Sequence, residues 1–326
     1  TFTNPLLGDG ADPWVVRHDD GFYYYTQTTG SDITLWRTKD ITDLENAERK
    51  VVWMPAQGAV NGTHLWAPEL HLLDGRWYIY FAASDGDMAR QRMYVLQSKG
   101  VDPFGEYAFP AGTQEGKMAD ASDKWAIDGT VLDYRGERYF IWSGWEGEVN
   151  DQQRLYIARM ASPWQLAGPR VEISRPELAW ERIGTPQVNE APQALLSPGG
   201  RLFLTYSASG SWTPYYCVGL LTADANANLL DPASWKKHPT PVFQQKPENE
   251  VFGPGGSSFV SSPDGKECYM LYHARQIPND APGAMDSRTP RLQKIEWDKD
   301  GMPILGIPDK TGTILPKPSG TKIAEK

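Results

Sequence analysis

The stretch that decides the fold is ADPWVVRHDDGFYYYT, residues 11–26. It consists of a short acidic entry, an apolar run, a turn built on glycine and a strand dense in aromatic residues. The Asp20-Gly21 pair is typical of a tight β-hairpin, because glycine adopts the positive φ that other residues resist. The stretch therefore predicts two antiparallel strands that are joined at Gly21.

The same pattern occurs four more times along the chain, at residues 67–81, 127–143, 189–206 and 255–273. The turn glycines are separated by 54, 61, 64 and 65 residues, and they are Gly21, Gly75, Gly136, Gly200 and Gly265. A third apolar strand is predicted after each hairpin, at residues 33–38, 93–97, 155–160, 216–221 and 292–297. The clearest fourth strands are residues 50–54 and 241–244.

Three or four antiparallel strands repeated five times are typical of a five-bladed β-propeller. We therefore predict an all-β fold, a five-bladed β-propeller that forms one domain over residues 1–326. A double β-sandwich is the structural alternative, and the repeat disfavours it because a sandwich does not need five equivalent units. The 13 Trp, 15 Tyr and 10 Phe residues fit many short strands better than long helices.

Charge and hydropathy argue against two classes of partner. The chain has 32 Lys and Arg against 41 Asp and Glu, a net charge of −9, which argues against nucleic-acid binding. No apolar run reaches the ~18 residues of a membrane span, so no membrane partner is expected. The chain begins Thr1-Phe-Thr-Asn-Pro without an initiator Met, as in a processed or trimmed chain, and this fits the secreted or periplasmic location that we expect.

Carboxylates recur where the predicted inner strands begin. In a propeller, side chains at equivalent entry positions of different blades converge on the central pocket. Asp12, Asp128 and Glu190 lie eight, seven and nine residues before the residue that precedes their turn glycine, which predicts one shared slot. Glu69 lies only five residues before that point, deeper along its strand. Glycines, including Gly256, occupy the slot of the fifth unit and leave room there.

Each acid also has a simpler interpretation. Asp12-Pro13 and Asp128-Gly129 resemble turn dipeptides, and Glu190 alone would pass for an exposed edge acid. Because all three acids fall in one slot, we favour a catalytic role over these simpler interpretations. Carboxylates crowded into a pocket cannot all ionise at neutral pH, so one can act as an acid and another as a base. Glycoside hydrolysis needs this division of roles.

The sequence resembles glycoside hydrolase family 43, the five-bladed propeller arabinofuranosidases, xylosidases and arabinanases. The matching stretches, in family order, are GADPWV (10–15), LWAPELH (65–71), IDGTV (127–131), VNEAPQ (188–193) and YHAR (272–275). Two longer stretches, residues 162–184 and 216–243, are similar to the exo-acting α-L-arabinofuranosidases. The resemblance implies a hydrolase that releases terminal α-L-arabinofuranose from arabinan or arabino-oligosaccharides, with the exo-1,5 linkage expected first.

The resemblance also implies an inverting mechanism with assigned roles. Asp12 would be the general base that activates water, and Glu190 the general acid that protonates the departing oxygen. Asp128 would orient Glu190 and raise its pKa. In an inverting enzyme the base and the acid stand about 6.5–9.5 Å apart, which leaves space for the water.

Other positions carry over less directly. His273 matches a family histidine near the axis that helps to hold a hydrated calcium or sodium ion, although a lone histidine in an aromatic strand is more often simply packed and hydrogen-bonded. Arg288 and Arg291 match a segment in which one arginine reaches the active-site carboxylates, and a solvated strand end is the alternative for either. The predicted substrate pocket is lined by Trp14, Trp66, Ile127, Asn189 and Ser209.

Related functions stay open at this point. A β-D-xylosidase or a debranching 1,2- or 1,3-arabinofuranosidase would use the same acids, and a non-catalytic glycan-binding propeller would use the same pocket. The repeated Ser-x-Asp-x-Gly-x-Thr-Trp boxes of sialidases and the Arg-Asp-Pro of retaining fructosidases are absent from the sequence. No cofactor is expected for the chemistry itself.

Overall fold

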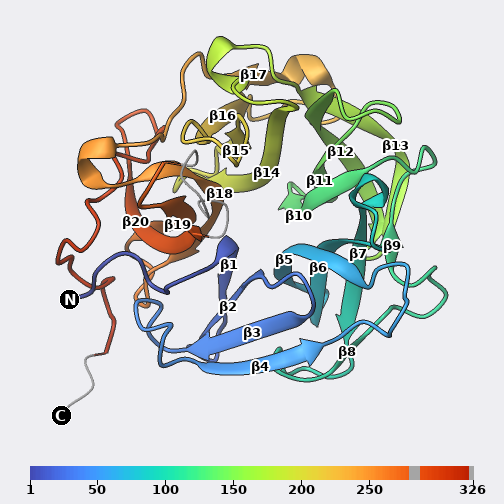
Figure 1. Cartoon of the computed structure of the whole chain (residues 1–326), viewed down its shortest axis with the longest axis horizontal. Coiled ribbons are helices and arrows are strands. Elements are labelled where there is room, and N and C mark those ends of the chain that lie inside the picture. Colours follow the sequence, from blue (N-terminus) through green and yellow to red (C-terminus); the bar gives the residue numbers. More distant parts are fainter. Residues whose placement is uncertain (279–286, 323–326) are drawn as a thin grey trace.

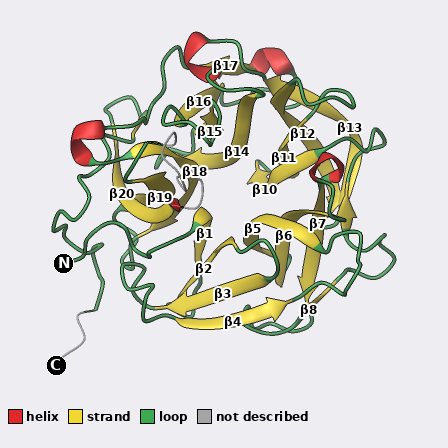
Figure 2. Cartoon of the chain, in the orientation of Figure 1, coloured by secondary structure: helices red, strands yellow, loops and turns green. Residues whose placement is uncertain are grey.

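The structure is a computed structural model that describes residues 1–278 and 287–322, and its long elements are all β-strands (Figures 1 and 2). The first antiparallel unit consists of β1 (Ala11–Arg17), β2 (Tyr23–Thr28), β3 (Ile33–Thr38) and β4 (Glu48–Trp53). The second consists of β5 (Thr63–Leu73), β6 (Arg76–Ser84), β7 (Arg92–Ser98), β8 (Tyr107–Ala108) and β9 (Lys117–Met118). The all-β prediction is confirmed.

Three further units complete the described chain. The third comprises β10 (Ala126–Tyr134), β11 (Glu137–Gly144), β12 (Gln152–Ser162) and β13 (Gln165–Ser174). The fourth comprises β14 (Gln187–Leu196), β15 (Leu202–Ala208), β16 (Cys217–Ala223) and β17 (Trp235–Lys237), and a short parallel pairing of β12 with β14 joins it to the third. The fifth comprises β18 (Phe252–Ser261), β19 (Cys268–Arg275), β20 (Thr289–Trp297) and β21 (Pro303–Ile304).

Short 3₁₀ turns lie in the connections. They are η1 (Met88–Arg90), η2 (Ala179–Glu181), η3 (Pro232–Ser234) and η4 (Pro247–Asn249). None of the helices in the described ranges is long and apolar enough to cross a membrane.

The predicted hairpins are confirmed. All five turn glycines have a positive φ, between 72° and 85°. The predicted third strands coincide with β3, β7, β12, β16 and β20. The fourth strand predicted at residues 241–244 is wrong, because this segment forms only an isolated bridge between Val218 and Phe243, and the outer strand of its unit is β17. Pro241 has no amide hydrogen to donate to a ladder, which disfavours a strand there.

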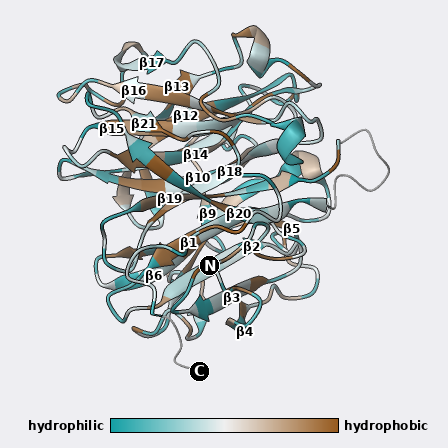
Figure 3. Ribbon diagram, turned by 90° about the vertical axis from the view of Figure 1, so that its left-hand side faces the viewer, coloured by the Kyte–Doolittle hydropathy of each residue, from teal (hydrophilic) through white to brown (hydrophobic). Residues whose placement is uncertain are grey.

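The first strands of the five units lie around the centre of the molecule (Figure 1). Each contacts the next in the series β1, β5, β10, β14 and β18, and β18 contacts β1. Five apolar clusters lie between successive units, including one between the fifth and the first. Figure 3 shows hydrophobic segments along the strands and hydrophilic residues in many of the connecting loops.

This packing explains the run of tyrosines in β2. Side chains alternate between the two faces of a strand. Tyr23 and Tyr25 belong to the cluster shared with the fifth unit, whereas Tyr24 belongs to the cluster shared with the second. Because both faces of the strand are buried, consecutive aromatic residues are accommodated and the sequence does not alternate between apolar and polar residues.

Every first strand contains a bulge near its beginning. The residue at the bulge has a positive φ in each unit, and these residues are Asp12, Ala67, Asp128, Ala191 and Gly256. A bulge leaves backbone groups outside the ladder. In four units the bulge N–H instead donates to a side chain of the preceding unit, the acceptors being His273, Thr28, Asp128 and Ser207.

Candidate active site

The bulges fix the register of the three acids. Asp12 and Asp128 are themselves bulge residues, whereas Glu190 lies one residue before the bulge residue Ala191. The predicted single slot is therefore correct for Asp12 and Asp128 and wrong by one position for Glu190. Glu69 lies two residues after the bulge residue of its own strand, in the different register predicted for it.

Asp12 is held by three neighbours from the first and fifth units. Its carboxylate Oδ2 accepts a hydrogen bond from Thr28 Oγ1 at 2.6 Å, and its backbone N–H donates to His273 Nδ1 at 2.9 Å. Arg288 Nη1 lies 3.7 Å from Asp12 Oδ1. The same Thr28 hydroxyl accepts the N–H of Ala67 at 2.8 Å. A hydroxyl donor and a guanidinium therefore face the two carboxylate oxygens of Asp12.

Glu190 and Asp128 form a pair that retains a proton. Burial, with a further contribution from the charge of Asp12, raises the pKa of Glu190 to about 7. Burial and the charges of Glu190 and Asp12 raise the pKa of Asp128 well above its usual range. Two such carboxyls cannot both ionise at neutral pH, so the pair can supply a proton.

Asp128 is also tied to the strand that carries Glu190. Its Oδ2 accepts the N–H of Ala191 at 3.0 Å, across the boundary between the third and fourth units. On the other side, Tyr216 donates its phenolic hydrogen to Glu190 Oε1 at 2.8 Å. The Tyr216 ring stacks on the His273 ring, with centroids 5.7 Å apart and planes 9° apart. The acid and the residue that holds Asp12 are therefore linked through packed rings.

A small cavity of about 20 Å³ lies among the first strands, and Asp12, Asp128, Trp14, Glu69 and Gln193 are among the residues that line it. Its volume is close to that of a single bound water. Glu69 is buried there between Gln193 and His71, and its Oε2 is 2.8 Å from His71 Nε2. Burial raises the pKa of Glu69, and this residue adds a fourth carboxyl to those of the three predicted acids.

The aromatic and aliphatic pocket residues lie in two environments. Trp14 lines the cavity, and its indole N–H donates to the carbonyl of Leu70 at 3.1 Å. Trp66 packs against the apolar cluster between the second and third units, to which the buried Ile127 belongs. Substrate contact by these three residues stays a prediction.

Two predicted pocket residues are not available to a substrate. Asn189 and Ser209 are fully buried. Ser209 Oγ donates to the carbonyl of Trp180 at 2.7 Å and accepts the N–H of Ile183 at 3.2 Å. The side chain of Asn189 is likewise bonded within the protein. The prediction that Asn189 and Ser209 line the pocket is therefore wrong, because both side chains already bind protein groups.

The two arginines lie in different places. Arg288 precedes β20 and faces Asp12, one of the active-site carboxylates. Arg291 is fully buried within β20 and donates from Nη1 to Thr311 Oγ1 at 2.9 Å. The prediction that Arg291 binds substrate is wrong, since the register of β20 pairs it with Tyr272 in the apolar cluster between the fourth and fifth units.

His273 does not fit a metal ion bound directly to its ring. Burial, together with the charges of Arg288 and Arg275, holds the pKa of His273 well below its usual range, so the ring is neutral. Nδ1 accepts the N–H of Asp12, which places the ring proton on the buried Nε2. Among residues 1–278 and 287–322, no group of three or more His, Cys, Asp or Glu side chains is arranged to hold a metal ion. A hydrated calcium or sodium ion reached through water stays a prediction.

Two further residues at the site have no distinct signal in the sequence. Thr28 ends an aromatic strand, and Tyr216 precedes an apolar strand in which an aromatic residue indicates packing. Their contacts with Asp12 and Glu190 depend on the bulges and on neighbouring units.

The chain is similar to known glycoside hydrolases. The family described as glycosyl hydrolases family 43 matches residues 2–303. An extracellular exo-α-(1→5)-L-arabinofuranosidase of Streptomyces avermitilis is 40% identical over 96% of this chain, and the match covers 64% of that protein. The chain thus spans less than two thirds of this relative.

Two further matches cover most of both partners. An extracellular exo-α-(1→5)-L-arabinofuranosidase of Streptomyces chartreusis is 41% identical, over 84% of this chain and 83% of that protein. The crystal structure of an α-L-arabinofuranosidase from Lactobacillus brevis superimposes with a TM-score of 0.88 at 34% identity, covering 96% of this chain and 98% of that one.

Proposed function

Because this chain belongs to glycosyl hydrolase family 43, we propose that its converging carboxyls perform an inverting glycoside hydrolysis that releases terminal α-L-arabinofuranose from arabinan or arabino-oligosaccharides. The observation that carries the proposal is the contrast between two acids. Asp12 lies beside a hydroxyl donor and an arginine, whereas the pKa of Glu190 is raised to about 7. The 1,5 linkage is the preferred substrate, as in the names of the Streptomyces relatives.

In the proposed mechanism Asp12 accepts a proton from a water molecule, and the water oxygen forms a bond to the anomeric carbon. The bond from that carbon to the departing sugar oxygen breaks, and Glu190 donates its proton to this oxygen. Asp128, whose own pKa is raised by burial and by the charges of Glu190 and Asp12, binds the N–H of Ala191 and so holds the strand that carries Glu190. Proton transfer of this kind contributes about 10²- to 10⁴-fold to rate.

We infer that the five units form one closed five-bladed β-propeller domain, with the active site where the first strands meet. The cycle of contacts from β1 to β18 and back to β1 supports closure, as do the five inter-unit clusters. Secretion or a periplasmic location fits the word extracellular in the relatives' names.

A substrate panel tests the proposal. The purified chain is incubated with linear 1,5-arabino-oligosaccharides, branched arabinan and xylo-oligosaccharides, and released sugars are followed by chromatography. Stepwise release of arabinose from the linear substrates is expected. Release of xylose alone would make the protein a xylosidase, and release only from branched arabinan would make it a debranching enzyme. Binding without release from any substrate would make it a glycan-binding protein.

The pH profile should follow the acid. Glu190 must be protonated to donate, and with its pKa at about 7 the protonated fraction falls as pH rises above this value. We therefore expect kcat/KM to decline tenfold per pH unit above pH ~7. The profile is measured on arabinobiose at substrate concentrations well below KM. A rate that stays constant between pH 7 and pH 9 would contradict the role of Glu190.

Replacing Tyr216 by Phe should shift the alkaline limb of the pH profile to higher pH. The hydroxyl of Tyr216 donates to the charged form of Glu190 and lowers the pKa of Glu190. Loss of a hydrogen bond to a charged group should raise that pKa by about one unit. Tyr156→Phe is the control, because the buried Tyr156 hydroxyl has no hydrogen-bond partner among the described residues. An alkaline limb at the same pH in Tyr216→Phe and the wild type would show that the Tyr216 hydroxyl does not set the pKa of the acid.

A further inference from the structure

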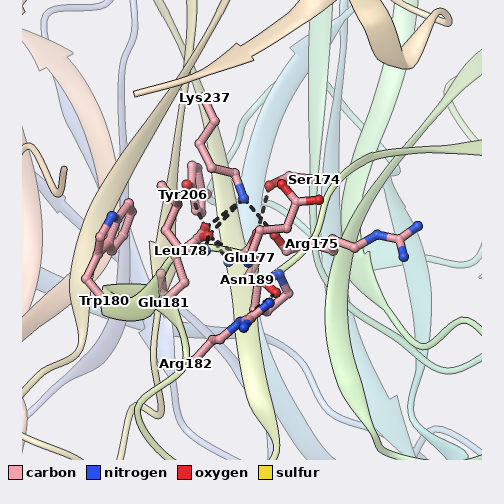
Figure 4. Close-up of polar contacts among 12 residues, drawn as sticks. Ser174, Arg175, Glu177, Leu178, Trp180, Glu181, Arg182, Asn189, Tyr206 and Lys237 are labelled. Carbon is pink, nitrogen blue, oxygen red and sulfur yellow. Dashed lines mark hydrogen bonds and ion pairs between the residues drawn. The ribbon is translucent and has the colours of Figure 1, made fainter. Parts of the chain in front are cut away.

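The most densely bonded carboxylate in the described chain outside the acid cluster is Glu181, at the end of η2 (Figure 4). It is fully buried. Its Oε1 accepts from Asn189 Nδ2 at 3.1 Å, from the Tyr206 hydroxyl at 2.9 Å and from Lys237 Nζ at 2.9 Å. Its Oε2 accepts the N–H groups of Glu177 and Leu178 and a second bond from Lys237.

These contacts keep Glu181 ionised. Burial raises its pKa, but hydrogen bonds from the Leu178 N–H and from Lys237 outweigh burial, and the net pKa is lowered. Lys237 reaches inward from the outer strand β17, and its Nζ is 5.7 Å from the centre of the Tyr206 ring. A buried ion pair with this many hydrogen bonds is satisfied, whereas removing one partner leaves an uncompensated charge.

One partner of Glu181 is the residue that immediately precedes the proposed acid. Asn189 also accepts a hydrogen bond from Ser174 Oγ at its Oδ1, 2.7 Å away, and donates from Nδ2 to the carbonyl of Val188. Its own carbonyl accepts from Ser143 Oγ at 2.8 Å. Every polar atom of the Asn189 side chain is therefore used, which fixes the backbone just before Glu190.

The residues on both sides of Glu190 are thus fixed by side chains from outside its own strand. Asn189 is held by Glu181 and Ser174, and Ala191 is held by Asp128. We propose that Glu181 is a positioning residue for Glu190, acting through Asn189 to hold the acid where it can protonate the departing oxygen. This inference rests on the proposed function.

The test uses the dependence of rate on the leaving group. A poor leaving group needs protonation by Glu190, whereas an activated aryl leaving group departs with little help. With Glu181→Gln, kcat should fall by about tenfold on arabinobiose and by less than twofold on a dinitrophenyl α-L-arabinofuranoside, because small displacements of a catalytic group cost rate. KM should change by less than twofold. A loss of folded protein alone would lower both rates by the same factor.

Two further variants keep the test decisive. Glu181→Gln/Lys237→Met removes both charges, so it avoids the unpaired lysine if the single variant fails to fold. Asp40→Asn is the matched control, because Asp40 forms a partly buried ion pair with Lys317 from the C-terminal segment, outside the contacts of Glu190. The control should leave the ratio of the two rates unchanged.

Equal losses on both substrates in the Glu181 variants would overturn the positioning role. A wild-type protein that cleaves neither substrate would instead overturn the proposed function, and with it the basis of this inference. The wild-type rates therefore separate the two failures.

Discussion

Asp12→Asn should lower kcat on linear arabino-oligosaccharides by about 10³-fold, within the range lost when a general base is removed. An amide cannot take the proton of the attacking water. It retains the size of the carboxylate, and the backbone N–H that donates to His273 is unchanged. The change should therefore act on kcat with little effect on the fold. Steady-state kinetics and the thermal midpoint, measured on the same preparation, check both expectations.

Two companion variants make the Asp12 result specific. Asp9→Asn removes an exposed carboxylate three residues earlier and should leave kcat unchanged. In Asp12→Gly the new glycine tolerates the positive φ of 54° at position 12, so the backbone should be retained. Azide should restore turnover of this variant, because azide attacks the anomeric carbon without the help of a base. The product should be the β-configured arabinofuranosyl azide. Retention of wild-type kcat by Asp12→Asn would contradict the role of this residue.

Glu190→Gln should have an effect that depends on the leaving group. The amide cannot protonate the departing oxygen, so kcat on arabinobiose should fall by about 10³-fold. On a dinitrophenyl arabinofuranoside the loss should be about tenfold or less, because that leaving group needs no proton. The alkaline decline near pH ~7 should also disappear from the residual activity. Kinetics on the two substrates, from pH 5 to pH 9, measure both effects.

The control for Glu190 is Glu248→Gln, an exposed carboxylate paired with Lys246. This variant should match the wild type on both substrates. If Glu190→Gln lowered both rates equally and kept the alkaline limb, the proton donor would have to be another carboxyl, and the buried Asp128 would be the first to consider.

The fold was largely predictable because its signals are local. A glycine with positive φ at each hairpin and aromatic strands such as residues 23–25 belong to short segments, so one unit at a time could be identified. The fourth strand of the fourth unit was not predictable in this way. Residues 241–244 are apolar enough for a strand, but the edge of the sheet is taken by β17 instead.

The site was predictable only as far as the acids themselves. Asp12 and Asp128 are bulge residues whereas Glu190 lies one residue before its bulge, and counts of eight, seven and nine residues from the turn do not distinguish these positions. The burial of Asn189 depends on Glu181 and on contacts between units. Such contacts join residues that are far apart in sequence, so no spacing along the chain reports them.

The arginines illustrate the same limit. Arg288 and Arg291 are separated by three residues in one motif, yet only Arg288, just before β20 begins, lies beside Asp12. Arg291 falls within the strand, where its side chain enters the apolar cluster between two units. The exact start of β20 decides this difference, and strand boundaries are the least predictable part of a sequence.

Under the proposed function, Asp12 and Glu190 carry out a single displacement with inversion. The most direct test is ¹H NMR of the purified protein with a linear α-1,5-arabino-oligosaccharide, recorded from the first minutes before the released sugar equilibrates. We expect the arabinose that is released from the chain end to appear first as β-arabinofuranose. First appearance of the α-anomer would mean retention through a covalent intermediate, and it would contradict the assignment of Asp12 as a base even if arabinose were released.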